Sequence, residues 1–176
     1  MERVTDEGHG ALIADRFFES LRVASVELVA GLPESLMRTV FRRLLDGVPG
    51  IPYVPVSNEA ELPGIAAGAY LGGVRSLVLM ENSGIRQCCE AVARLSFSHQ
   101  IPFVLGMTYR GELGETNWWG HSHAQTMIPV LQALRIPFTH VRTPDDMVGA
   151  VDLAWKHADS SQWPVALIYG GQAVEH

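Results

Sequence analysis

Residues 58–71 read Asn-Glu-Ala-Glu-Leu-Pro-Gly-Ile-Ala-Ala-Gly-Ala-Tyr-Leu, and this stretch carries the chain from an extended segment into a helix. The predicted helix is almost entirely small and apolar, so the carboxyl group of Glu59 has little water and little countercharge near it in sequence. Loss of water disfavours the charged form of a carboxylic acid, and an acid held close to neutral is suited to transferring protons. The stretch therefore marks Glu59 as a candidate catalytic residue.

On both sides of this stretch, short apolar runs typical of strands alternate with longer runs at helical spacing. We expect strands at 26–30, 51–56, 76–81, 102–108, 137–141 and 164–169, and helices at 12–23, 35–45, 61–71, 86–96, 124–134 and 145–157. The alternation predicts an α/β fold with a mostly parallel six-stranded sheet flanked by helices. We expect a single three-layer domain over residues 1–176, with its core at about 12–170.

Two of the predicted helices have sequence signals at their starts. Thr143 is suited to cap the last helix, with Pro144 in its first position. Asn58 and Glu61 have the spacing of a capping box, but that start would place Pro63 inside the helix at the cost of a backbone hydrogen bond. The alternative is a later start, with Glu61 itself near the cap.

The composition narrows the class of protein. Of the 176 residues, 47% are hydrophobic and 18% are charged, which suits one folded domain and argues against disorder. The formal charge of −6, with a single lysine, indicates no nucleic-acid partner. The polar residues 1–7 do not resemble a signal peptide, and no run has the length of a membrane span. Adjacent Cys88 and Cys89 are expected to be reduced core thiols of a cytoplasmic protein.

Ligands of parallel α/β sheets bind beyond the carboxyl ends of the strands. The candidate segments for a site are therefore those that follow the predicted strands, at 31–34, 57–59, 82–84, 109–123 and 170–171. The connection 109–123 is long, and long loops in compact domains are often functional. Neither common glycine-rich phosphate-binding motif is present in the chain.

Taken in order, these segments resemble the pyrimidine-binding (PYR) domain of thiamine-diphosphate-dependent 2-oxoacid decarboxylases. Within that family the chain looks like the separate alpha subunits of the sulfopyruvate and phosphonopyruvate decarboxylase type. The resemblance runs from about residue 12 to residue 169 and is strongest at 59–73. The Tyr-Arg-Gly-Glu segment at 109–112 also matches. The resemblance implies the thiamine-diphosphate-binding PYR-domain fold.

In this family one glutamate of the PYR domain hydrogen-bonds the N1′ atom of the cofactor's aminopyrimidine, and the matching residue is Glu59. The resemblance therefore implies that Glu59 activates thiamine diphosphate, which attacks the 2-keto carbon of the substrate before CO₂ leaves. It also implies cofactor contacts from Ser83, Gly84 and Gln87. The family's Ser-Gly-Leu-Gly-Asn here reads Ser-Gly-Ile-Arg-Gln, so Arg86 and Gln87 are departures from the family pattern.

The family divides the cofactor site between two domains. A second domain holds the diphosphate and Mg²⁺ through a Gly-Asp-Gly…Asn motif, and no Gly-Asp-Gly occurs in this chain. The resemblance therefore implies a beta subunit that carries this diphosphate-binding (PP) domain, in a hetero-oligomer with at least two copies of each chain. The implied substrate is a small anionic 2-oxoacid such as sulfopyruvate or phosphonopyruvate, which is converted to the aldehyde and CO₂.

Three residues are candidates for binding the substrate. Arg110 could bind an anionic group of the substrate through two hydrogen bonds from its guanidinium group. Alternatively, it could form an ion pair with Glu112 or Glu115 in a solvated loop. Arg86 lies at a predicted helix N-terminus, where free amides favour anions. Glu34 follows the first strand, where the family's substrate loop lies, but it could equally be a first-turn acid stabilised by the helix dipole.

Two histidines and two tryptophans stand close together in the long loop. Some related decarboxylases carry two histidines in the equivalent loop for proton handling, which makes His121 and His123 catalytic candidates, and we favour His121. They could instead be surface histidines, and no third ligand has the spacing of a metal site. Trp118 and Trp119 could line the substrate pocket or anchor a subunit interface, and we slightly favour the interface.

Two alternative functions remain at the level of sequence. The chain could be the PYR subunit of a thiamine-diphosphate enzyme that performs C–C ligation or ketol transfer. It could also be a non-catalytic α/β binding module, because a fold does not by itself define a function.

Overall fold

The computed structural model describes residues 6–175, and these form six strands: β1 Leu28–Gly31, β2 Tyr53–Pro55, β3 Ser76–Glu81, β4 Val104–Thr108, β5 Phe138–Val141 and β6 Val165–Tyr169. The strands pair in the order β2-β1-β3-β4-β6-β5, and each of these pairs is parallel. The predicted α/β fold with a six-stranded sheet is confirmed. Residues 1–5, on which the signal-peptide inference partly rested, lie outside the described residues.

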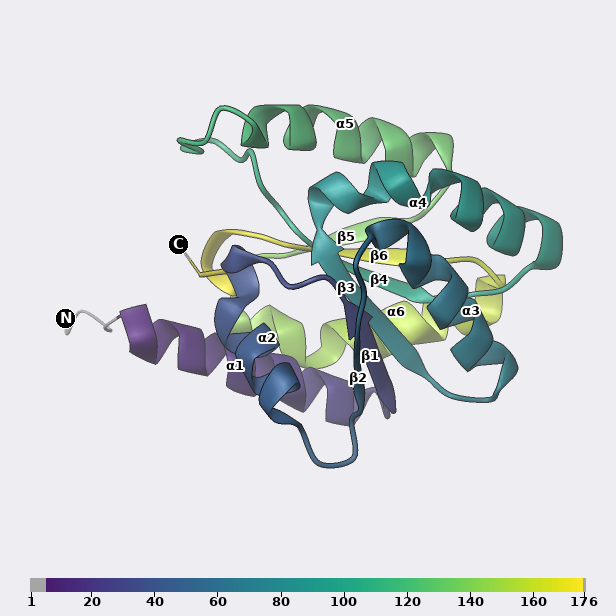
Figure 1. Ribbon diagram of the computed structural model, residues 1–176, viewed down its shortest axis with the longest axis horizontal. Coiled ribbons are helices and arrows are strands. Elements are labelled where there is room, and N and C mark those ends of the chain that lie inside the picture. The colour runs from purple at the N-terminus through teal and green to yellow at the C-terminus, as the bar shows by residue number, and fades with distance from the viewer. Residues whose placement is uncertain (1–5, 176) are drawn as a thin grey trace.

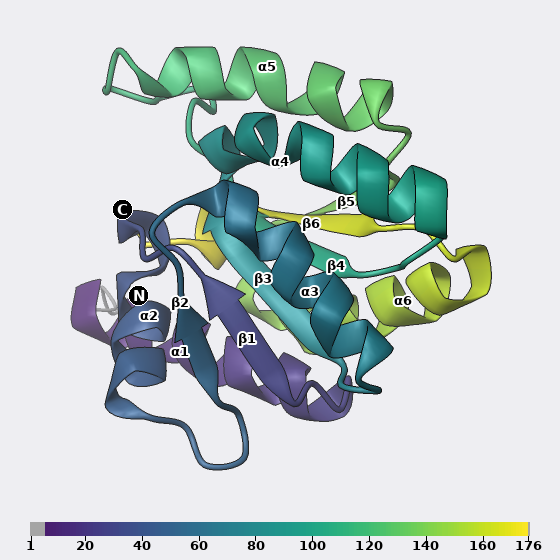
Figure 2. The same ribbon diagram turned by 45° about the vertical axis from the view of Figure 1, so that its right-hand side comes forward.

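Helices cover both faces of the sheet (Figure 1). One face packs against α1 (Asp6–Val23), α2 (Arg38–Asp46) and α6 (Pro144–Ser161), and the opposite face packs against α3 (Leu62–Leu71), α4 (Ile85–Val92) and α5 (Gly120–Ala133). The turned view in Figure 2 separates the same three layers. Within residues 6–175 no helix is long and apolar enough to cross a membrane.

Each face of the sheet has its own apolar core. Along β3, Leu77 and Leu79 belong to the core shared with α1, α2 and α6, while Val78 and Met80 belong to the core shared with α3, α4 and α5. A strand that is buried on both faces reads as a continuous apolar run. This property explains why residues 76–81 were recognisable as a strand from sequence.

The strand order reverses between β1 and β3: the chain continues from β1 to β2 on one side, and from β3 to β4 on the other. The chain passes from β1 to α2 on one face of the sheet, and from β3 to α4 on the other face (Figure 1). Connections that leave two neighbouring strands toward opposite faces mark the usual ligand site of an open α/β sheet. Glu34, which follows β1, and Glu81, which ends β3, both lie at this point.

The start of α3 follows the later of the two alternatives. A short 3₁₀ turn, Glu59–Glu61, precedes the helix, and Asn58 caps this turn by accepting a hydrogen bond from the Ala60 amide at 2.8 Å. Helix α3 then begins at Leu62 with Pro63 in its first turn, where a missing amide hydrogen costs nothing. The capping box between Asn58 and Glu61 is therefore wrong.

The predicted starts of α6 and α5 compare differently with the structure. Thr143 caps α6 as predicted, in a capping box with Asp146 and with Pro144 in the first turn. Helix α5 begins at Gly120, earlier than the predicted start at residue 124. The long connection therefore ends at residue 119, and the two histidines thought to lie in a loop are in the first turn of a helix.

Candidate active site

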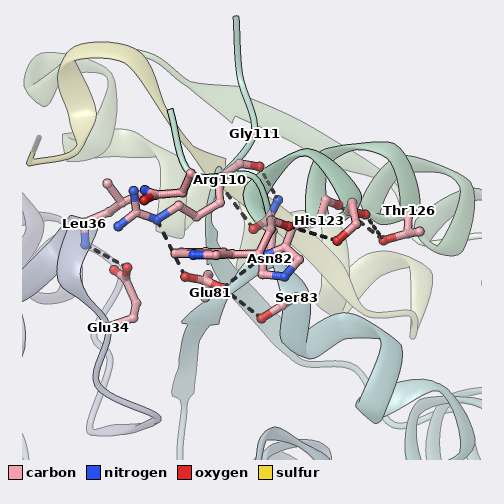
Figure 3. Close-up of polar contacts among 12 residues, drawn as sticks. Glu34, Leu36, Glu81, Asn82, Ser83, Arg110, Gly111, His123 and Thr126 are labelled. Atoms are coloured by element: carbon pink, nitrogen blue, oxygen red, sulfur yellow. Dashed lines mark hydrogen bonds and ion pairs between the residues drawn. The ribbon is translucent and has the colours of Figure 1, made fainter. Parts of the chain in front are cut away.

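Polar side chains from four segments meet at the carboxyl ends of β1, β3 and β4 (Figure 3). Glu34 follows β1, Glu81 ends β3, Arg110 follows β4, and His123 lies in the first turn of α5. Because β3 lies between β1 and β4 in the sheet, its last residue lies between the groups that these neighbours contribute. We refer to these four residues as the polar cluster.

Glu81 is the centre of the polar cluster. Its Oε1 accepts a hydrogen bond from the Ser83 hydroxyl at 3.0 Å and lies 3.1 Å from Nδ1 of His123. Its Oε2 lies 3.7 Å from Nε of Arg110. The three side chains are largely removed from water, with 17% of Glu81, 13% of His123 and 14% of Arg110 exposed. The carboxylate therefore faces an arginine on one side and a histidine on the other.

Side chains hold the guanidinium group of Arg110 in one orientation. Its Nη2 donates to the Ser35 hydroxyl at 2.5 Å, and its Nη1 lies 3.7 Å from Oε2 of Glu115. Of the two partners named in the alternative to substrate binding, Glu115 pairs with Arg110, away from solvent, whereas Glu112 pairs with Arg142. Arg110 is thus a fixed cation whose charge two carboxylates already balance in part.

Asn82 and Trp119 also contact Arg110, one at its backbone and the other at its guanidinium group. The side chain of buried Asn82 donates to the Arg110 carbonyl at 2.9 Å and accepts from the Arg110 amide at 3.2 Å. The Trp119 ring centroid lies 5.4 Å from Cζ of Arg110 and 5.3 Å from the ring centroid of His123. Trp119 therefore belongs to the site, while Trp118 is 84% exposed and remains a candidate interface residue.

Glu34 is a partly buried residue in the segment that follows β1. Its Oε2 accepts a hydrogen bond from the Leu36 amide at 2.7 Å, so it caps the short 3₁₀ turn Ser35–Met37. Its Oε1 is buried and has no hydrogen-bond partner among the described residues. Burial raises the pKa of Glu34 to about 7, the Leu36 amide opposes this rise, and the nearby charge of Glu81 adds to it. Near neutral pH this group is therefore a source or acceptor of a proton.

Glu59 lies beside the polar cluster, after β2. It is 7% exposed, and its Oε2 accepts a hydrogen bond from Nε2 of Gln87 at 3.0 Å. A Cβ atom at position 84 would lie 2.5 Å from Cγ of Glu59, so glycine there allows the close approach of the two segments. The structure thus brings together Glu59, Gly84 and Gln87, while the Ser83 hydroxyl turns to Glu81.

The two cysteines are free thiols, as predicted. Cys88 is buried and its thiol donates to the Glu59 carbonyl at 3.2 Å. Burial, with a smaller effect from Glu59, raises the pKa of Cys88 to about 12. A thiol with this pKa is uncharged near neutral pH, which fits a structural contact that supports the Glu59 segment.

Two predicted site residues lie outside the polar cluster. His121 is exposed, because residues two apart on a helix point in different directions and His123 takes the inward one. The preference for His121 over His123 therefore does not agree with their placement. Arg86 is also exposed, and its Nη1 donates to the Thr126 hydroxyl at 2.7 Å, which links α4 to α5.

Glu81 and Glu115 are the site residues that the sequence analysis missed. Glu81 was counted only as the last residue of a strand, although that position at the carboxyl end of a central parallel strand was the available signal. Glu115 was considered only as a partner of Arg110. Among the described residues no group of three or more His, Cys, Asp or Glu side chains could hold a metal ion.

No protein-family profile matches the chain. The chain is 28% identical over 163 residues to the protein named sulfopyruvate decarboxylase subunit alpha of Methanococcus maripaludis, covering 93% of this chain and 97% of that protein. It is 30% identical over 131 residues to the protein of the same name from Methanothermobacter thermautotrophicus, covering 74% of this chain and 79% of that protein.

Two more distant similarities involve longer proteins. The chain is 34% identical over 90 residues to the phosphonopyruvate decarboxylase of Streptomyces viridochromogenes, covering 51% of this chain but 22% of that protein. Its fold matches part of a 2-oxoglutarate:ferredoxin oxidoreductase from Magnetococcus marinus with a TM-score of 0.70 and 16% identity, covering 92% of this chain and 29% of that one. The second similarity concerns the fold alone.

Proposed function

The chain belongs to the family of sulfopyruvate decarboxylase alpha subunits, and from this premise we propose that it is the alpha subunit of a thiamine-diphosphate-dependent decarboxylase. The proposed substrate is a small anionic 2-oxoacid, sulfopyruvate or phosphonopyruvate, and the products are the aldehyde and CO₂. The observation that carries the proposal is the buried carboxyl group of Glu59, held against Gly84 and Gln87 next to the polar cluster. A family of alpha subunits implies a partner subunit.

The surroundings of Glu59 fit the aminopyrimidine of thiamine diphosphate. A ring nitrogen needs one hydrogen-bonding carboxyl group in a site with little water, and Glu59 is such a group. Gln87 holds one of its oxygens at 3.0 Å, and the glycine at position 84 lets the two segments pack closely. When bound, the cofactor would supply a thiazolium ring that acts as an electron sink when CO₂ leaves. Glu59 would hold the proton shared with N1′.

The polar cluster would serve the substrate side of the site. Arg110 would orient the substrate through its planar fork, because Ser35 and Trp119 already fix the guanidinium plane. Glu34 and His123 would hold and move protons, since the pKa of Glu34 is raised to about 7 and imidazole is a common acid–base group of active sites. Arg86, at the rim, would add positive charge toward an anionic tail.

The diphosphate and Mg²⁺ would be held by the partner subunit. This assignment rests on the absence of a Gly-Asp-Gly motif from the sequence. The proposed assembly contains at least two copies of each chain.

Co-expression with a chain that carries Gly-Asp-Gly…Asn tests the proposal. CO₂ release would be followed from sulfopyruvate, phosphonopyruvate and pyruvate, with and without thiamine diphosphate and Mg²⁺. We expect release that requires both chains and both cofactors, and the ranking of the three substrates identifies the tail. Full activity of the single chain, or a stable complex that releases no CO₂ from any of the three, would contradict the proposal.

Glu59→Gln is the variant that addresses the mechanism. We expect it to lower the rate of CO₂ release by at least about 100-fold, the scale of a lost proton-transfer group, with the unfolding free energy little changed. Glu90→Gln, a change on the exposed side of α4 where the carboxylate pairs with Arg94, is the matched control. Retained activity of Glu59→Gln would remove this residue from the mechanism.

A further inference from the structure

Glu81 has no part in the proposed reaction, yet its carboxylate contacts more of the polar cluster than any other group in it. Its position is rigid, because β3 is hydrogen-bonded to β1 on one side and to β4 on the other. The next residue, Asn82, is fully buried and is bonded in both directions to the backbone of Arg110. The carboxylate therefore projects from a fixed point of the fold, and its partners are arranged around it.

His123 meets this fixed carboxylate through one ring nitrogen. Nδ1 is buried and lies 3.1 Å from Oε1 of Glu81, and it has no hydrogen-bond partner among the described residues. The distance is that of a hydrogen bond, although the N–H direction is not aligned with the oxygen. Glu81 is thus the acceptor within reach of this nitrogen.

A carboxylate against Nδ1 selects one of the two neutral forms of the imidazole. The hydrogen stays on Nδ1, where the negative charge stabilises it, and Nε2 is left as the atom that gains or loses a proton. Arg110 is a further charged group near the ring, because both contact Trp119, and Arg86 reaches the same helix at Thr126. Neither is a hydrogen-bond acceptor that could compete with Glu81.

We propose that Glu81 is a positioning residue whose carboxylate holds the hydrogen of His123 on Nδ1 and so presents Nε2 to the site. The same carboxylate balances the charge of Arg110 through Oε2, so one side chain orders both the cation and the proton-exchanging ring. The proposal about the tautomer stands on the geometry of the chain alone, while its consequence for turnover rests on the proposed function.

The tautomer is measured directly by nitrogen NMR of the full chain labelled with ¹⁵N-histidine. The signal of His123 is identified by its absence in His123→Asn. At a pH where this ring is neutral, we expect a protonated-type shift at Nδ1 and an unprotonated-type shift at Nε2. The opposite assignment in the wild-type protein would overturn the proposal without any need for a variant.

Variants then isolate the role of the carboxylate. In Glu81→Gln we expect the Nδ1–H form to lose its dominance, whereas Glu81→Asp keeps a carboxylate and Glu90→Gln leaves the His123 signals unchanged. Circular dichroism establishes whether each variant is folded. A folded Glu81→Gln protein with the wild-type tautomer would contradict the proposal.

Kinetics of the complex with its partner separate this inference from the proposed function. We expect Glu81→Gln to lower kcat by about 100-fold with a smaller change in KM, and to add no further loss to His123→Asn. If the complex lacks decarboxylase activity while the Nδ1–H form is observed, the proposed function fails and the tautomer assignment stands. Normal kcat in Glu81→Gln would overturn the positioning role.

Discussion

Glu34 carries a carboxyl group that the fold has removed from water. Burial raises its pKa from 4.5 to about 7, so the folded protein holds this proton more tightly than the unfolded chain does. For an acid whose pKa rises on folding, stability is highest below the unfolded pKa and falls as the pH rises toward the folded one. The window for Glu34 lies between about pH 4.5 and pH 7.

Glu34→Gln should remove this pH dependence while keeping an oxygen for the Leu36 amide. Between pH 5 and pH 8 we expect the wild-type protein to lose up to about 2.5 kcal/mol more unfolding free energy than the variant, since one pKa unit corresponds to about 1.4 kcal/mol. Urea unfolding at several pH values measures the difference, with Glu90→Gln as the control. Parallel curves for wild type and Glu34→Gln would show that Glu34 has an ordinary pKa.

Gly84 is a second residue whose role depends on contact distances. Glu59 Cγ at 2.5 Å and Met80 Sδ at 2.8 Å leave no room for a Cβ atom, so Gly84→Ala must displace the Glu59 side chain or the strand. We expect a loss of about 1–3 kcal/mol in the free energy of unfolding, the range for overpacked sites.

Gly149→Ala is the matched control for this change. Gly149 is exposed within α6, and apart from its chain neighbours and the backbone of its own helix no atom lies within 4 Å of a Cβ built there. Alanine should stabilise the helix by about 0.5–1 kcal/mol. Urea unfolding measures the change in unfolding free energy of both variants. Equal changes for the two substitutions would contradict the packing argument at position 84.

At the scale of elements, the first turn of α5 decides which histidine reaches the polar cluster. A loop would have left both rings free to turn inward. The helix fixes their directions, and it places His123 against Glu81 and Trp119 while His121 faces solvent. The early start of the helix, at Gly120, is therefore what gives the two histidines different environments.

The two histidines should accordingly differ in the complex with the partner subunit. We expect His123→Gln to lower kcat by about 100-fold, the scale of a lost acid–base group, and His121→Gln to change it less than about 3-fold. Steady-state CO₂ release measures both, with circular dichroism to compare folding. A larger loss in His121→Gln would mean that the partner subunit turns the exposed ring toward the substrate.

At the scale of the whole molecule, the order of the strands assembles the site. Glu34, Glu81 and Arg110 come from the ends of β1, β3 and β4, which are neighbours in the sheet but lie far apart in the chain. Glu59 joins them after β2, at the edge of the same group, through contacts with Gly84 and Gln87. The proposed partner would cover these groups and supply the diphosphate half of the site.

The sequence by itself determined the fold class and most element positions. Strand β3 was predicted to the residue and the start of α6 by its capping residues, because hydrophobic periodicity and helix caps are local properties that neighbouring residues express. The buried position of Glu59 followed in the same way from the apolar helix after it.

Only the tertiary structure decided the partners within the site. The contacts of Glu81 with Arg110 and His123 join residues about 30 and 40 positions apart, and they depend on the pairing of β3 with β4 and on the packing of α5. No local pattern encodes such pairings, because the free energy of each contact depends on the burial and orientation that the completed sheet imposes.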